Sequence, residues 1–271
     1  MVHKYSFQEP IYRGREITGY QDIPDDDKVY EQRMMRGGKP AFPRFITGFA
    51  ELDATLGGLP YALTIFNGTS GSGKSKLCKS IAEVSNCVYV CAESLMDAPD
   101  IPKERVLDYV KFQPKSDKAI RQLFSSIRSM EKHGMDVDIV FIDSLTLFLS
   151  GTTAAVMEAD VREGCFTISS ICEGQIPIVG ISEMRGSGNN VYSAGGKAVD
   201  FASSMLVSFD RVDINNWNKK KYQANEGERI YTMDVQKDRQ GVAQQSNEYQ
   251  VTYSEGDVKL RKISYAESRK E

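Results

Sequence analysis

The hydrophobic pattern of the chain changes near residue 44. Residues 1–43 are mostly polar, with the acidic run Asp25-Asp26-Asp27, a basic cluster from Arg33 to Lys39, and prolines at 10, 24, 40 and 43. This composition favours an extended N-terminal arm over 1–43, with a short helix near Asp27 to Met35 as its one regular element.

Apolar runs alternate with amphipathic segments after Phe45. Length separates the short buried strands from the helices, because periodicity alone does not distinguish them in such runs. We expect strands at 63–67, 87–92, 137–144 and 176–182, and helices at about 74–85, 116–132 and 156–172. This succession predicts an α/β fold with a mainly parallel twisted sheet and helices on both faces.

The hydrophobic pattern changes again after Gly196, where short apolar runs typical of strands are joined by turn-rich segments. Strands are expected at 205–212, 229–235, 248–253 and 258–263. They predict a C-terminal antiparallel extension of the sheet. One main domain therefore covers 44–265, and 266–271 form a flexible tail.

Composition narrows the class of protein. The chain has 271 residues and 41% hydrophobic residues, which is enough for one large core. No long apolar run or secretory leader is visible, so we expect a soluble cytoplasmic protein, or a virion-associated one if the source is viral. Five cysteines form no CxxC pair, as is typical of buried free thiols. A net charge of -3 argues against a protein that coats nucleic acid with its whole surface, but leaves room for a local basic loop.

The strongest chemical motif lies between the expected strand 63–67 and the expected helix 74–85. It fits the pattern G-x4-G-K-S/T with Gly68-Thr69-Ser70-Gly71-Ser72-Gly73-Lys74-Ser75. The glycines allow successive N–H groups to face an anion, and the helix N-terminus adds partial positive charge. Lys74 would bind the β and γ phosphates of ATP, and the Ser75 hydroxyl would bind Mg²⁺. The alternative is a chance Gly/Ser turn before a helix.

Asp143 ends the apolar strand VDIVFID. Ligand sites in parallel sheets open at the carboxyl ends of the strands, so this carboxylate is a candidate Mg²⁺ ligand. The alternative is a helix N-cap. The next residue is Ser144, whereas many P-loop ATPases carry a glutamate there.

The general base must then come from another strand. Glu93 follows the strand CVYVCA and should emerge at the same sheet edge, where it could polarise the attacking water. The alternative is a surface residue or a cap at the strand exit.

These motifs together resemble the RecA-type core shared by RecA, RadA, KaiC and the DnaB-type helicases. The segment from Thr47 to Gly58, TGFAELDATLGG, is similar to RadA and KaiC, and the resemblance covers roughly 44–265. It implies a RecA-like P-loop ATPase fold, MgATP as cofactor, and Glu93 as the residue that activates water.

The second half of the chain carries two further similarities. Residues 194–203, AGGKAVDFAS, are similar to a stretch of RecA, and Lys237-Asp238-Arg239 is similar to the K-x-R element of KaiC and DnaB-type helicases. The resemblance implies that Lys237 and Arg239 reach the γ-phosphate of a neighbouring subunit and are catalytic, together with Glu93 and Lys74. Period 2 places both cations on the same side of a strand. The alternative is a solvated, charged hairpin end.

In the resembled fold, two loops face a central axis and contact nucleic acid. Here they correspond to about 150–156 and 185–194. The second contains Arg185, Asn189, Asn190 and Tyr192, which can bind phosphates and stack on bases, although its composition is also ordinary for a mobile loop. The first loop has no basic residue. Ser182-Glu183 is expected to occupy the place of a γ-phosphate sensor.

A hairpin-like insertion combines Trp217 with Lys219-Lys220-Lys221-Tyr222. It could bind nucleic acid or a neighbouring subunit, or could be a solvated hairpin.

The function hypothesis is an oligomeric ATPase that couples hydrolysis to movement on, or remodelling of, single-stranded nucleic acid, as in helicases and packaging motors. It would assemble with itself as a ring, expected to be a hexamer, or as a filament, with the arm 1–43 docking onto a neighbour. The alternatives are a KaiC-like regulatory ATPase acting on a protein partner and a recombinase-type filament.

Overall fold

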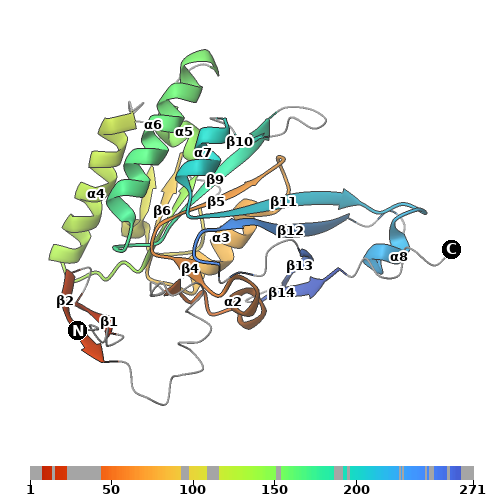
Figure 1. The fold of residues 1–271 in the computed structure, drawn as a ribbon, viewed down its shortest axis with the longest axis horizontal. Helices are drawn as coiled ribbons and strands as arrows, with labels where there is room; N and C mark the ends of the chain where they lie inside the picture. Colours follow the sequence, from red (N-terminus) through yellow and green to blue (C-terminus); the bar gives the residue numbers. More distant parts are fainter. Residues whose placement is uncertain are drawn as a thin grey trace, which may run out of the picture.

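The structure is a computed structural model in which a large α/β body follows a short N-terminal hairpin (Figure 1). It describes residues 8–13, 16–22, 44–92, 98–108, 116–150, 154–185, 192–193, 196–225, 227, 229–241, 243, 247–254 and 257–263.

A ten-stranded sheet forms the centre of the body, with the main order β14-β13-β12-β11-β5-β9-β8-β6-β7. Its neighbours from β11 to β7 are all parallel. These strands are β11 (Met205–Asp213), β5 (Leu63–Gly68), β9 (Ile178–Arg185), β8 (Ile139–Asp143), β6 (Cys87–Cys91) and β7 (Val106–Asp108). Every residue of β5 and β6 is buried, as expected for strands that are covered on both faces. The predicted α/β class with a mainly parallel sheet is confirmed.

Three antiparallel strands extend the sheet beyond β11. They are β12 (Arg229–Asp238), β13 (Glu248–Ser254) and β14 (Asp257–Lys262), and they confirm the predicted C-terminal extension. The β11–β12 hairpin reaches beyond the helices and carries the short α8 (Lys219–Tyr222) at its tip, at the end of the molecule opposite to α4 (Figure 1).

Helices cover the two faces of the sheet unequally. One face packs against α4 (Ser116–Lys132), α5 (Leu145–Ser150), α6 (Ala154–Cys172) and α7 (Lys197–Ala202). The other face packs against α2 (Ala50–Leu56) and α3 (Lys74–Glu83). Apolar side chains of β12, β13 and β14 face α2 and α3, so the opposite face of this extension carries the polar residues.

Smaller elements complete the described chain. The strands β3 (Arg44–Phe45) and β4 (Leu59–Pro60) pair with each other, η3 (Lys103–Arg105) precedes β7, and β10 (Tyr192–Ser193) pairs with β9. In the arm, β1 (Gln8–Arg13) and β2 (Glu16–Asp22) form an antiparallel hairpin. The sequence reading missed this hairpin because proline and polar residues interrupt the apolar alternation there. The helix predicted near Asp27 to Met35 lies outside the described residues.

The five cysteines are buried and free, as predicted. Among the described residues, no helix has the length and apolar character needed to cross a bilayer.

Candidate active site at the carboxyl edge of the sheet

The glycine-rich loop joins the buried strand β5 directly to α3, which begins at Lys74. Gly73 precedes the helix with a φ of 94°, a conformation that favours glycine. A Cβ added at Gly68 would collide with the carbonyl oxygen of Phe209, and one at Gly73 would lie 3.0 Å from the Tyr253 hydroxyl. Glycine at these two positions therefore lets the loop pack directly against β11 and β13.

The Lys74 ammonium lies inside this loop. Its side chain is only 5% exposed, and Nζ donates to the carbonyls of Gly68 at 2.9 Å and Thr69 at 2.7 Å. Nζ also lies 3.3 Å from the Ser72 hydroxyl. The loop thus surrounds the Lys74 ammonium with its own carbonyl groups. A phosphate oxygen can replace one of these carbonyls as the acceptor of the Lys74 ammonium.

Asp143 ends β8 at the same edge of the sheet. The strand register places Asp143 opposite Cys91 of β6. The preceding residue, Ile142, lies opposite Gly180 of β9, and Gly180 lies opposite Ile65 of β5. One strand separates β8 from β5, which corresponds to about 10 Å between their backbones. The Ser75 hydroxyl and the Asp143 carboxylate can therefore approach one cation from two sides, and oxygen ligands suit Mg²⁺.

Tyr89 on β6 fixes the Asp143 carboxylate, a contact that the sequence analysis missed. Its hydroxyl donates to Asp143 Oδ2 at 2.9 Å. Burial, and secondarily nearby groups that include Asp143, raise the pKa of Tyr89, so the hydroxyl keeps its proton and remains a donor. The available signal was the alternation in CVYVC, which places Tyr89 and Cys91 on one face.

Within the described residues, no group of three or more His, Cys, Asp or Glu side chains could hold a metal ion alone. Magnesium bound with a nucleotide needs few protein ligands, because phosphates and water supply the others. Ser75 and Asp143 therefore fit a metal that arrives with ATP.

Several predicted site residues are only partly described or lie outside the described residues. Glu93, Asn189 and Asn190 lie outside them. Arg185 and Tyr192 are opposite each other in the β9–β10 pairing, so their backbones form the base of one hairpin, as the predicted second loop requires. Of the predicted first loop, residues 154–156 belong to α6 and Ser150 ends α5.

The predicted sensor pair lies beside the phosphate loop. Ser182 pairs with Asn67 and Glu183 with Gly68 in the β5–β9 ladder. Ser182 is buried, whereas Glu183 is exposed. Glu183 is therefore the member of the pair that can meet a ligand from solvent.

A polar network that the sequence analysis missed starts next to the phosphate loop. The Ser208 hydroxyl donates to Asn67 Oδ1 at 2.7 Å, and Asn67 Nδ2 donates to Ser193 Oγ at 3.2 Å. Ser193 in turn donates to the Asp200 carboxylate, whose pKa is raised by burial. The network links the residue before Gly68 to β10 and to α7.

Lys237 and Arg239 lie together toward the opposite edge of the sheet, where the parallel strands begin. Lys237 pairs with Leu206, which pairs with Ile65, three residues before Gly68. The pair is therefore about 10 Å away from the phosphate loop along the strands, and about 10 Å across them.

Both cations bind the carboxyl end of α7. Lys237 Nζ donates to the carbonyls of Asp200 at 2.5 Å and Ser203 at 2.5 Å, and Arg239 donates to the carbonyl of Phe201. The intervening Asp238 points the other way into a buried ion pair with Arg44 at 3.0 Å. Lys237 and Arg239 thus share one side of the chain, as period 2 predicts. Burial and the neighbouring Arg239 lower the pKa of Lys237 to about 8.

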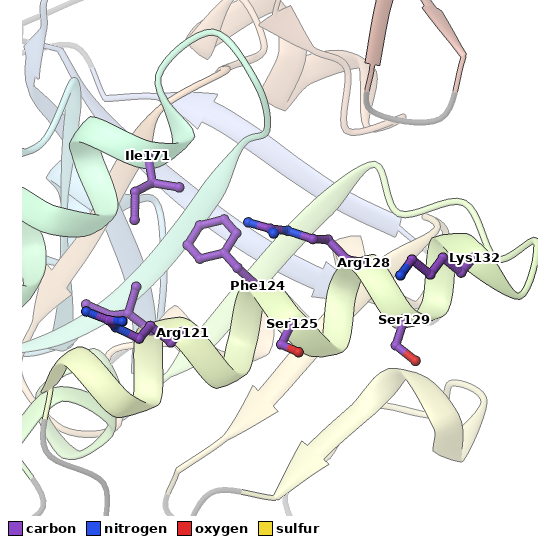
Figure 2. Close-up of a pocket in the computed structure, with 8 residues that line it drawn as sticks. Arg121, Phe124, Ser125, Arg128, Ser129, Lys132 and Ile171 are labelled. Carbon is purple, nitrogen blue, oxygen red and sulfur yellow. The ribbon is translucent and has the colours of Figure 1, made fainter.

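One hollow borders the phosphate loop and another lies away from it. The larger, of about 750 Å³, opens on the polar face of the extension and reaches Asn67, Thr69 and Asp200. The other, of about 570 Å³, is lined by α4 and by Ile171 of α6, with Phe124 pointing toward Ile171 and Arg128 beside it (Figure 2). No residue of the phosphate loop lines this second hollow, so it is separate from the candidate active site.

Comparison with known proteins supports the class of this site. Residues 64–163 match the model of the family described as ATPase family associated with various cellular activities (AAA). A search of curated proteins found no match. The matched segment contains the phosphate loop and Asp143. The chain is accordingly a P-loop ATPase that hydrolyses ATP and uses Mg²⁺.

Proposed function

We propose that the chain is a RecA-like ATPase that assembles into a ring or filament and uses hydrolysis to move on, or remodel, single-stranded nucleic acid. Each nucleotide site would be completed by Lys237 and Arg239 of the next subunit. The observation that carries this proposal is the position of these two cations, which share one side of the chain and lie far from their own phosphate loop.

Residues of one subunit would bind the phosphates, the magnesium and the attacking water at the carboxyl edge of the sheet. Lys74 would bind the β and γ phosphates, while Ser75 and Asp143 would hold magnesium, whose charge stabilises the transferring phosphoryl group. Glu93 would orient the attacking water and accept its proton. Ser144 after Asp143 is not an acid, so a base must come from another strand.

The neighbour would supply the remaining positive charge. Arg239 is exposed and has no acidic partner among the described residues, since its guanidinium binds the carbonyl of Phe201. A phosphate oxygen is a stronger acceptor than a carbonyl, so a neighbouring nucleotide could replace that contact. Charge placed where it develops in the transition state accelerates phosphoryl transfer.

The contacts at α7 suggest how hydrolysis could be coupled to a bound strand. Lys237 and Arg239 bind the carboxyl end of α7, and Asp200 within α7 accepts a hydrogen bond from Ser193 of β10. β10 belongs to the hairpin that carries Arg185 and Tyr192. A change in the contacts of the two cations would therefore act on the same helix that holds the base of the candidate nucleic-acid loop.

The decisive experiment measures ATP turnover with and without single-stranded DNA and RNA, together with strand binding at low salt. The proposal expects at least one of the two strands to bind and to raise turnover. Absence of both effects, with turnover intact, would contradict the nucleic-acid function and favour a regulatory ATPase with a protein partner.

A further inference from the structure

Trp217 is the most exposed large apolar side chain among the described residues and the only tryptophan of the chain. It is 95% exposed, at the turn before α8 on the β11–β12 hairpin. Its indole therefore contributes almost nothing to the packing of this subunit, although aromatic side chains gain most when they are buried.

The turn that presents Trp217 is tightly built. Asn215 Oδ1 accepts hydrogen bonds from the backbone N–H groups of Trp217 at 2.9 Å and Asn218 at 3.1 Å. Asn218 Oδ1 accepts from the N–H of Asn215 at 2.8 Å, and its Nδ2 donates to the carbonyl of Asp213 at 3.2 Å. Two asparagines thus clamp the backbone on both sides of the indole, which reduces the entropy that binding would cost.

A small separate core supports this turn. Ile214, Tyr222, Ile230 and Ile263 form a buried cluster beneath it. Lys221 makes an ion pair with Glu248 at 2.9 Å, and the Tyr222 hydroxyl donates to the same carboxylate at 3.2 Å. The hairpin tip is consequently a platform fixed to the sheet, from which one aromatic ring projects.

The surroundings of the ring indicate the chemistry of its ligand. Asn215, Asn216 and Lys220 are exposed and Lys219 is half-buried, so the indole has amides and cations around it and is not part of an apolar patch. A protein interface needs an apolar core that is larger than one side chain. A flat ring beside lysines suits an unpaired base and its phosphates, because any base can stack on indole while the cations neutralise the backbone.

The position of the tip agrees with such a ligand. Phe209 of β11 is level with Gly68, and the strand continues for four residues to Asp213, about 13 Å farther. β11, β5 and β9 are parallel, so the tip, the phosphate loop and the hairpin of Arg185 and Tyr192 share one edge of the sheet. A single nucleic-acid strand running along this edge of the sheet could contact both hairpins.

We propose that Trp217 is a stacking platform for a base of single-stranded nucleic acid, with Lys219 and Lys220 binding the adjoining phosphates. This inference rests on the proposed function, because it adds a contact surface to the same activity. Lys221 is not part of the surface, since the Glu248 carboxylate pairs with its ammonium. Lys219 Nζ donates to the neutral Asn216 Oδ1 at 2.7 Å, an acceptor that a charged phosphate oxygen can replace.

The single tryptophan makes the test direct, because all tryptophan emission of the full chain comes from Trp217. Emission is recorded while oligothymidylate or oligouridylate is added, and binding is followed in parallel by the anisotropy of a labelled strand. Stacking predicts quenching that follows the binding curve. Trp217→Ala should weaken binding by about 5- to 150-fold, and Trp217→Phe by less, because a phenyl ring still stacks. Basal turnover of ATP should remain unchanged in both variants.

Salt dependence tests the lysines. Lys219→Gln/Lys220→Gln should reduce the slope of log affinity against log salt by about 1.4, because each phosphate contact with a single strand contributes about 0.7. The matched control Lys259→Gln/Lys262→Gln, on β14, should leave the slope unchanged. Arg121→Gln/Arg128→Gln changes two arginines of α4 that line the hollow of about 570 Å³. A loss of affinity confined to this variant would assign the nucleic-acid strand to that hollow and overturn the proposal.

Three other results would overturn it as well. A strand that binds and stimulates turnover while Trp217 emission stays constant would refute the platform and leave the proposed function intact. Emission that changes with protein concentration alone would place Trp217 in a subunit contact. Absence of strand binding would refute the platform and the proposed function together.

Discussion

Two lysines of this protein bind main-chain carbonyls in two different regions. Lys74 binds the carbonyl of Gly68, six residues away, inside the phosphate loop at the carboxyl edge of the sheet. Lys237 binds the carbonyl of Asp200, 37 residues away, at the opposite edge. The first contact joins residues of one sequence motif, whereas the second depends on the packing of β12 against α7.

Under the proposed function, this difference separates nucleotide binding from turnover. The loop around Lys74 has what phosphate binding needs, namely a glycine-rich backbone, a buried cation and a helix N-terminus. The end of β12 lies about 10 Å from that loop along the strands and about 10 Å across them, so under the proposed function it acts on the nucleotide of a neighbouring subunit. Variants of the first region should therefore lose binding and turnover together, while variants of the second should lose turnover alone.

The largest effect is expected from Lys74→Ala. Removing the ammonium leaves the phosphates without their buried cation, so nucleotide binding and turnover should both fall to background. A fluorescent ATP analogue and a phosphate-release assay measure the two quantities. Lys79→Ala, which changes a half-buried lysine farther along the same helix, is the control and should behave as wild type. Normal turnover in Lys74→Ala would mean that the loop is not the site.

Arg239→Ala should leave ATP binding unchanged and lower kcat by about 10³-fold, the lower range for a transition-state arginine. Arg229→Ala, at the start of the strand β12 that Arg239 directly follows, is the control, because the ion pair of Arg229 with Asp213 is exposed. Equal losses in the two variants would indicate a general effect on β12. Weakened ATP binding in Arg239→Ala would place this residue with the first region.

Glu93→Gln should keep nucleotide binding and lower kcat by about 10²-fold, because the amide cannot accept the proton of water. Binding and single-turnover hydrolysis separate the two effects. Hydrolysis at the wild-type rate would assign the base to another residue.

A smaller, pH-dependent effect is expected at Lys237. Its pKa is lowered to about 8 by burial and by Arg239, so its positive charge is complete below that pH and is lost as pH rises through it. Turnover should then fall about tenfold for each pH unit above 8 if this charge is needed. Lys237→Arg should remove the decline, because a guanidinium stays charged. The same decline in both proteins would assign it to another group.

The smallest effect is expected from Tyr89→Phe. The Asp143 carboxylate would lose a hydrogen bond of 2.9 Å, and the magnesium concentration for half-maximal turnover should rise about fivefold. Tyr222→Phe, which also removes a hydroxyl that donates to a carboxylate, should leave this concentration unchanged. An unchanged value in both variants would mean that Tyr89 does not position Asp143.

Eight of the ten strands of the central sheet could be predicted from the sequence, in their order along the chain and to within about three residues at each end, whereas the short β7 and β10 were missed. Strands such as β5 and β6 are short, rich in apolar residues and end next to glycine or polar residues, which makes them recognisable without knowledge of their neighbours. The helix α4 begins and ends where predicted, because its polar and apolar positions alternate with a clear helical period. α5 was missed because its sequence LTLFLS is too short and too apolar to show a period.

The candidate site was predictable only where its chemistry is local. The phosphate loop and Asp143 are recognisable from adjacent residues. The contact of Tyr89 with Asp143 joins residues 54 apart, and that of Asn67 with Ser193 joins residues 126 apart. Both depend on which strands become neighbours. The attachment of Lys237 to α7 likewise follows from the β11–β12 register, which a single sequence does not determine.

The most direct test of a site shared between subunits mixes two inactive proteins. Arg239→Ala retains an intact phosphate loop, and Lys74→Ala retains intact cations at the end of β12. In an equal mixture that exchanges subunits, one interface in four combines the two intact halves, so about a quarter of the wild-type turnover should return. Turnover that stays at background, although the mixed proteins assemble together, would contradict the shared site and assign Arg239 to its own subunit.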